Sequence, residues 1–162
     1  MIGGGSNMYH IRVRACALIV ENDSVLLIQF TDEDGIHYNL PAGGTEPGET
    51  IIEAVKREAF EEAGVEVEVG DLVFVSENAP HMTGHKVHGL SLMFRCHIKE
   101  GSVPTLPINP DPNQTDVLWI PINELDKIVL FPNIKDQITQ YVKGEYQNNR
   151  LIEEYKLKEQ LI

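Results

Sequence analysis

Apolar and polar positions along the chain predict a mixture of strands and two helices. Strand patterns, either alternating or nearly all apolar, cover residues 10–20, 24–30, 36–40, 65–76, 87–98 and 116–120. Helical spacing of apolar residues covers 50–63 and 133–143. The chain has 162 residues, which is enough for one domain with a full hydrophobic core and too few for two ordinary domains.

The first predicted helix carries clear signals for where it begins and ends. Thr50 and Glu53 have the spacing of a capping box, in which each side chain accepts a hydrogen bond from the other residue's backbone. Gly64 stands where a glycine often ends a helix. We therefore expect a well-defined helix over 50–63, with a core-facing stripe formed by Ile52, Val55, Ala59 and Ala63.

The two ends of the chain are expected to lie outside the folded domain of residues 8–144. The leader, 1–7, is rich in glycine and is predicted to be flexible. The second helix is expected to begin at Asn133 as its cap and to end at Gly144. The tail, 145–162, is polar with scattered Leu and Ile, and fits either a docked helix or a frayed end.

Two segments between the predicted strands have the composition of loops. Residues 77–86 carry Pro80 and several histidines. Residues 100–115 hold four prolines, which predicts a long mobile loop. Long loops of this kind are often functional.

Charge and cysteine content exclude several classes of protein. The net charge of -12 argues against a protein that coats nucleic acid, and it makes binding of an anionic substrate difficult unless a cation mediates. No apolar run approaches the roughly 20 residues of a membrane-spanning helix. Cys16 and Cys96 alternate with apolar strand residues, which predicts buried free thiols in a reducing, cytoplasmic protein.

Six glutamates crowd the stretch between Gly43 and Val65, and three of them, Glu58, Glu61 and Glu62, share one face of the predicted helix. Like charges three and four residues apart destabilise a bare helix, and the helix dipole disfavours anions in its last turn. A solvated acidic face is one interpretation of the helix spacing alone. A site for Mg²⁺ or Mn²⁺ is the other, because hard carboxylate oxygens suit these cations.

The full spacing favours the second interpretation. Gly43, Glu49 and the run from Arg57 to Val65 resemble the signature of the Nudix hydrolases, G-x5-E-x7-R-E-U-x-E-E-x-G-U, where U is a bulky aliphatic residue. Every invariant position matches, and Ala59 at the first U is the one departure. The resemblance extends in context over residues 10–143 and implies an α/β/α sandwich around a mixed β-sheet.

The resemblance also implies an activity, namely Mg²⁺-dependent (or Mn²⁺-dependent) cleavage of a nucleoside diphosphate linked to another moiety. By position, Glu58 and Glu62 are the expected metal ligands, and Glu61 is a third ligand or the base. The loop before the helix is expected to offer the Ala42 carbonyl to the metal.

Glu49 and Arg57 match the pair that orients this segment in the family. We expect a salt bridge between them that holds the loop to the helix. In the implied reaction water attacks a phosphorus atom, metal ions neutralise the phosphate oxygens and acidify the water, and a carboxylate takes the proton.

Substrate choice is expected to depend on residues outside the signature, where the indications conflict. Pro80 resembles a downstream proline that marks ADP-ribose pyrophosphatases, which favours ADP-ribose or another sugar nucleotide. Those enzymes often place a catalytic Glu in a late loop, and residues 101–115 contain none. Glu100, Asp111 and Asp116 are the nearest substitutes, and each is also a candidate for a solvent-facing or turn residue.

Several other residues could contact a substrate. His81, His85 and His88 cluster in sequence without a recognisable zinc spacing, and are read either as loop surface or as phosphate or base contacts. Lys86 and Arg95 are candidate phosphate contacts because of their neighbourhood.

The alternatives within the family include hydrolases of (deoxy)nucleoside triphosphates, of dinucleoside polyphosphates and of capped RNA ends. Two further hypotheses are a non-catalytic nucleotide sensor and an isomerase of allylic diphosphates on the same fold. Trp119 is expected to pack rather than to stack on a substrate. The apolar residues of the tail make a homodimer a further hypothesis.

Overall fold

Eight strands form one mixed sheet in the computed structural model, which describes residues 10–146 and 149–160. The predicted leader, 1–7, lies outside the described residues. The strands are β1 (Ile11–Glu21), β2 (Ser24–Asp32), β3 (Gly35–Asn39), β4 (Ala42–Gly44), β5 (Val67–Asn78), β6 (His88–Ile98), β7 (Gln114–Pro121) and β8 (Leu151–Glu153). The helices are α1 (Ile51–Ala63), α2 (Pro80–Thr83) and α3 (Lys135–Val142), with 3₁₀ turns η2 (Ile122–Lys127) and η3 (Glu154–Lys156).

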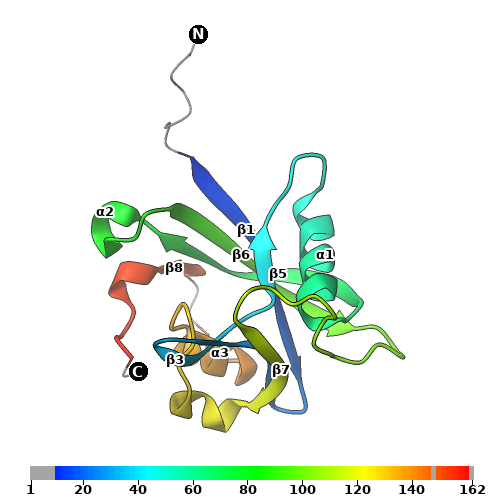
Figure 1. Ribbon diagram of the computed structural model, residues 1–162. Coiled ribbons are helices and arrows are strands. Elements are labelled where there is room, and N and C mark those ends of the chain that lie inside the picture. The colour runs from blue at the N-terminus through cyan, green and yellow to red at the C-terminus, as the bar shows by residue number, and fades with distance from the viewer. Residues whose placement is uncertain (1–9, 147–148, 161–162) are drawn as a thin grey trace.

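The strand order is β3-β2-β1-β6-β5-β8, with β4 paired to β1 and β7 paired to β2. The pairs β1–β6 and β5–β8 are parallel, and the other pairs are antiparallel. Figure 1 shows the resulting arrangement, with α1 and α3 lying apart and the strands running between them.

Alternation along β1 divides the hydrophobic core into two layers. Cys16 and Leu18 point into a cluster that includes Ile138 of α3, whereas Ala15 and Ala17 point into a cluster that includes the apolar stripe of α1. Helices therefore cover both faces of a mixed sheet. This arrangement confirms the expected α/β/α sandwich.

Helix α1 begins and ends where the sequence predicts. The Thr50 side chain accepts a hydrogen bond from the Glu53 amide at 3.1 Å, and the Glu53 carboxylate accepts one from the Thr50 amide at 2.9 Å. Gly64 adopts a left-handed conformation with φ of 69° and donates its amide to the Phe60 carbonyl. Both ends of α1 are thus fixed, which holds its glutamates in register with the loop before it.

The prediction for the start of the second helix was wrong. Helix α3 begins at Lys135 after Ile134, with no side-chain cap. Asn133 instead donates its side-chain amide to the Lys158 carbonyl in the C-terminal tail. Because the Asn133 side chain bonds the tail, it does not cap the start of α3.

The C-terminal tail forms no docked helix within its described residues. It adds β8 to the edge of β5 and then makes the turn η3. Ile152 is only 7% exposed, so the tail packs into the hydrophobic core of its own chain.

Other local expectations had mixed outcomes. Cys16 and Cys96 are buried and free, as expected. Trp119 was expected to pack, but its side chain is 36% exposed on β7. Residues 77–86 are not all loop, because Pro80 begins the short helix α2. The proline-rich segment is irregular but anchored, since the Thr105 amide donates to Ala63 at the end of α1.

Within the described residues, no helix has the length and apolar character that crossing a membrane would need.

Candidate metal and catalytic site

Arg57 ties the glycine-rich loop to helix α1. Its Nε and Nη2 donate to the two oxygens of Glu49 at 3.0 and 2.6 Å, and Nη2 also donates to the Gly44 carbonyl at 3.0 Å. Its Nη1 donates to Glu58 at 2.7 Å and to Glu61 at 3.2 Å. The hydrogen bonds from Arg57 lower the pKa of Glu49. The expected salt bridge between loop and helix is therefore present, and the guanidinium also holds Glu58.

Glu58 and Glu62 turn from α1 toward the loop and are buried, with 9% and 7% of their surface exposed. Glu62 Oε1 accepts the Ala42 amide at 2.7 Å. A Cβ at position 43 would overlap the Glu58 carboxylate, so only glycine leaves room for it. These contacts explain why the loop has glycine, which lacks a side chain, where its backbone faces the carboxylate of Glu58.

Burial disfavours the ionised form of both carboxylates and so raises the pKa of each. It raises the pKa of Glu58, against the effect of Arg57, and raises that of Glu62 to about 8, with the nearby Asp111 carboxyl adding to the increase. Two buried acids beside each other are unfavourable without a cation. Two buried carboxylates side by side are typical of a cation site. The carboxylates of a surface acidic patch would instead be exposed to water.

Asp111 brings a carboxylate from the proline-rich segment to this site. Although the residue is exposed, its carboxyl is near enough to Glu62 to raise the pKa of that group. Gln114, which is 5% exposed, donates its side-chain amide to the Glu62 carbonyl at 2.8 Å and accepts the Asp111 amide at 3.4 Å. The segment is thereby bound to the end of α1.

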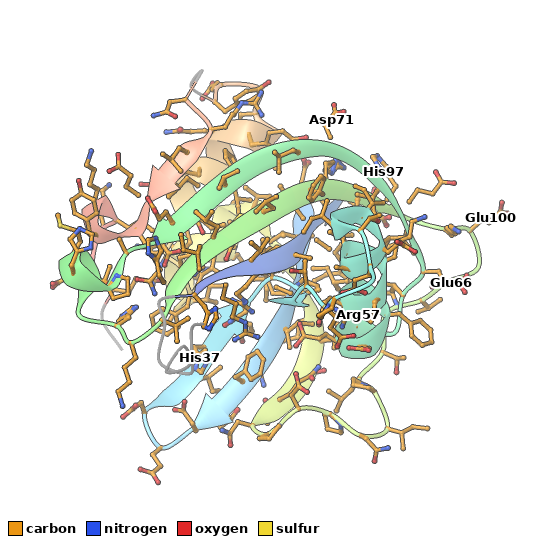
Figure 2. All side chains as sticks on the ribbon, turned by 90° about the horizontal axis from the view of Figure 1, so that it is seen from above. His37, Arg57, Glu66, Asp71, His97 and Glu100 are labelled. Atoms are coloured by element: carbon orange, nitrogen blue, oxygen red, sulfur yellow. The ribbon has the colours of Figure 1, made fainter. Side chains whose placement is uncertain are left out.

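The structure separates the other predicted residues from this group. Glu61 is half exposed and contacts Arg57 rather than the buried pair. Arg95 donates to the Val20 carbonyl at 2.7 Å, and Lys86 is exposed after α2. Glu100 lies at the outer end of its loop, away from Arg57 (Figure 2).

The three histidines lie apart from the buried pair, with His81 in α2, His85 in the loop after it and His88 at the start of β6. His88 bonds to Glu77 at 2.8 Å, and His85 bonds to Asn78 at 2.9 Å. Gln114 is the contact that sequence reasoning missed, because a glutamine at the start of a strand carries no distinctive signal.

The donor set fits a magnesium-type ion better than a zinc-type ion. Within the described residues, no three His, Cys, Asp or Glu side chains converge as a complete metal site. Mg²⁺ usually takes one or two protein carboxylates and completes its shell with water and substrate phosphates. Glu58 and Glu62 beside the loop backbone supply that partial set of hard oxygen donors.

Comparison with known proteins agrees with this geometry. The family model described as NUDIX domain matches residues 8–142. The 8-oxo-dGDP phosphatase NUDT18 of Homo sapiens is 44% identical over 77 residues, which are 43% of this chain and 24% of that protein. The RNA pyrophosphohydrolase of Bartonella clarridgeiae is 27% identical over 125 residues, 69% of this chain and 71% of that protein.

Among solved structures, a NUDIX hydrolase from Nitrosomonas europaea superposes with a TM-score of 0.70 at 22% identity, covering 90% of this chain and 80% of the other. This likeness shows the fold. The match to human NUDT18 spans about a quarter of that protein's length. The family match over most of the chain carries the assignment, and the chain belongs to the Nudix hydrolase family.

Proposed function

We propose that this chain is a Mg²⁺-dependent pyrophosphohydrolase that acts on a nucleoside di- or triphosphate or on a nucleoside diphosphate linked to another moiety. The observation that carries the proposal is the buried pair Glu58 and Glu62, held against the glycine-rich loop by Arg57 and the Ala42 amide. Such a pair is costly to bury unless it binds a cation.

Each residue has a proposed role in this reaction. Glu58, Glu62 and the Ala42 carbonyl hold the metal, which when bound neutralises phosphate oxygens and acidifies the attacking water. Arg57 positions Glu58 and is itself aligned by Glu49.

Proton acceptance is assigned to a carboxylate at the same end of α1. Asp111 is the first candidate, because its exposed carboxyl lies near Glu62 and raises the pKa of that group. Glu61 is the second, because it remains accessible to water. The accepted proton comes from the water whose oxygen forms the new bond to phosphorus, as the bridging oxygen leaves on the departing phosphate.

Relatives favour a nucleoside phosphate or RNA over a sugar nucleotide as the substrate. The two relatives described above are named for an oxidised deoxyguanosine diphosphate and for RNA. A structural neighbour from Streptococcus suis is named an ADP-ribose pyrophosphatase, but at 18% identity it speaks for the fold alone. ADP-ribose therefore stands as the second candidate, resting on Pro80. The two buried free thiols support a reducing compartment, and we place the protein in the cytoplasm.

A substrate panel tests the proposal. Release of phosphate, pyrophosphate and nucleoside monophosphate would be measured for all common nucleoside di- and triphosphates, 8-oxo-dGDP, ADP-ribose, a diadenosine polyphosphate and triphosphate-ended RNA. Each would be assayed with Mg²⁺, Mn²⁺ or EDTA. We expect metal-dependent turnover of one class. Binding of Mg²⁺ without turnover of any compound would instead support a non-catalytic nucleotide sensor.

A further inference from the structure

The end of helix α1 depends on hydrogen-bond donors from elsewhere in the chain. The last turn of any helix leaves its final carbonyls without partners inside the helix. In α1 this end carries Glu61 and Glu62, and its last turn has no basic residue to offset the negative end of the helix dipole. Donors that reach these carbonyls therefore stabilise the part of α1 that holds the candidate metal site.

The proline-rich segment, residues 100–115, supplies two of these donors. The Thr105 amide donates to the Ala63 carbonyl at 2.9 Å, and the Gln114 side-chain amide donates to the Glu62 carbonyl at 2.8 Å. Figure 1 shows this segment, between β6 and β7, passing the end of α1. The part of the segment between Thr105 and Gln114 is thus held against the helix at both of its ends.

Gln114 makes the second of these contacts from a buried position. It is 5% exposed and lies at the start of β7, where it pairs with Phe30 of β2. A buried amide costs free energy unless its polar atoms are bonded, and an apolar side chain would suit such a strand position better. Both polar atoms are bonded here, because Oε1 also accepts the Asp111 amide at 3.4 Å. Gln114 therefore links Asp111 to the end of α1.

The backbone at Asp111 has little freedom of its own. Pro110 precedes it and Pro112 follows it, and a residue before proline is restricted to extended conformations. Asn113 then turns the chain with φ of 69°, and the Gln114 amide donates to the Asp111 carbonyl at 3.0 Å. Asp111 is thus bonded to Gln114 through both its amide and its carbonyl.

The carboxyl of Asp111 is open to water and close to the buried pair. Burial is the main cause of the raised pKa of Glu58 and of Glu62, and the Asp111 carboxyl adds to the increase in both. A carboxylate in such a place can take a proton from an attacking water efficiently only if it is held in position. A misplacement of about 1 Å can cost about a hundredfold in rate.

We propose that Gln114 is a positioning residue for the reaction, which fixes the Asp111 carboxylate beside Glu62 by bonding both the Asp111 backbone and the end of α1. The inference rests on the proposed function and deepens it. Asp111 takes the proton of the water whose oxygen bonds to phosphorus, as the bridging oxygen leaves on the departing phosphate. Both polar atoms of Gln114 face backbone groups, so this residue acts through Asp111 and not on the substrate.

A double-mutant cycle measures whether Gln114 acts through Asp111. The kcat and KM would be determined for wild type, Gln114→Met, Asp111→Asn and the double variant, with Mg²⁺ and the best substrate of the panel. Methionine keeps the length of the side chain and removes both hydrogen bonds. We expect Gln114→Met to lower kcat at least about tenfold, as loss of a positioning contact does, and to change KM by less than about threefold.

The double variant separates positioning from stability. It should be no slower than Asp111→Asn alone, to within about twofold, because Gln114 has nothing to position once the carboxylate is gone. A residue that only stabilises the fold would multiply its loss onto that of Asp111→Asn. The matched control Gln140→Met makes the same replacement at an exposed position of α3, and it should leave kcat and KM unchanged.

Two further measurements guard against misfolding of Gln114→Met. Hydrogen exchange by mass spectrometry should be faster in residues 105–113 of this variant than in the wild type, because the segment has lost one of its two contacts with α1. Pro112→Ala loosens the backbone beside Asp111 at an exposed position, so the melting temperature should stay near the wild-type value. It should lower kcat by about threefold, and by no further factor in the Asp111→Asn background.

The two proposals fail in different ways. Absence of wild-type turnover with every compound and metal of the panel would remove the hydrolase proposal and the positioning role with it. Metal-dependent wild-type turnover would leave the hydrolase proposal standing. In that case, full kcat in Gln114→Met or in Asp111→Asn, losses that multiply in the double variant, or unchanged hydrogen exchange in residues 105–113 would overturn the positioning role alone.

Discussion

At the scale of single residues, the site is defined by two carboxylates that the fold keeps away from water. Glu58 and Glu62 are both buried, and the loop backbone and Arg57 supply their hydrogen bonds. Buried acids shift their pKa upward because the charged form loses hydration. In the proposed metal site, a bound cation would restore the interaction that burial takes from the charged form.

This burial predicts how stability depends on pH in the metal-free protein. The pKa of Glu62 is about 8 when folded and 4.5 ordinarily. The folded state therefore binds the Glu62 proton more tightly than the unfolded state does. The stability that this proton gives to the folded state is lost as pH rises from about 4.5 to about 8. Melting temperatures in EDTA at pH 5 to 8 should fall more steeply for the wild type than for Glu62→Gln, whose amide does not ionise. Parallel curves would contradict the burial effect.

A separate prediction concerns Arg57, whose planar guanidinium donates hydrogen bonds to four residues. Lysine keeps the charge but cannot bond both Glu49 oxygens and also the Gly44 carbonyl and Glu58. Arg57→Lys should lower kcat by about 10- to 100-fold, as loss of a positioning contact does. The exposed neighbour Lys56 offers the control Lys56→Arg, which should leave kcat unchanged. Equal kcat values for wild type and Arg57→Lys would show that the fork is dispensable.

At the scale of elements, the sequence correctly predicted the helices and strands that depend on contacts between residues close together in the chain. Helix α1 follows its capping box and its terminal glycine, and β1 forms where the apolar pattern of residues 10–20 predicted a strand. The resemblance to the Nudix signature also implied the Glu49–Arg57 salt bridge, which is present.

Contacts between segments far apart in the chain could not be predicted from these local sequence patterns. Asn133 bonds the tail rather than capping α3, and β8 exists because β5 offers an open edge. Strand β4 has three residues, Ala42–Gly44, too few for a pattern. Asp111 reaches Glu62 only because Gln114 holds its loop to α1. The sequence thus predicted where the glutamates of α1 lie, but not which residues from the rest of the chain lie beside them.

Strand β4 supplies a prediction of its own. A methyl group at position 43 would overlap the Glu58 carboxylate, whereas at position 44 it would meet only the flexible end of Arg12 at 3.0 Å. Gly43→Ala should therefore displace Glu58 and lower both Mg²⁺ affinity and kcat by at least about tenfold. Gly44→Ala, one residue away, should lose much less. Calorimetric Mg²⁺ titration and rate assays of both variants would compare them, and equal losses would refute the steric account.

At the scale of the whole molecule, the buried carboxylates beside the loop before α1 and a cavity lined by Arg12 and Arg14 lie on different sides of β1. A chain with a net charge of -12 can hold an anionic substrate only where local cations outweigh the general repulsion. The arginines Arg12 and Arg14, which line the cavity, and the proposed metal would supply such cations.

The measurement that tests the central claim most directly is the Mg²⁺ dependence of turnover for wild type and Glu62→Gln, on the best substrate of the panel. Glutamine retains an acceptor for the Ala42 amide, so the fold should persist, as circular dichroism and the melting temperature would report. We predict Mg²⁺-dependent turnover by the wild type and at least about a hundredfold lower kcat for the variant. Wild-type turnover by Glu62→Gln, or full activity in EDTA, would contradict the assignment of this site.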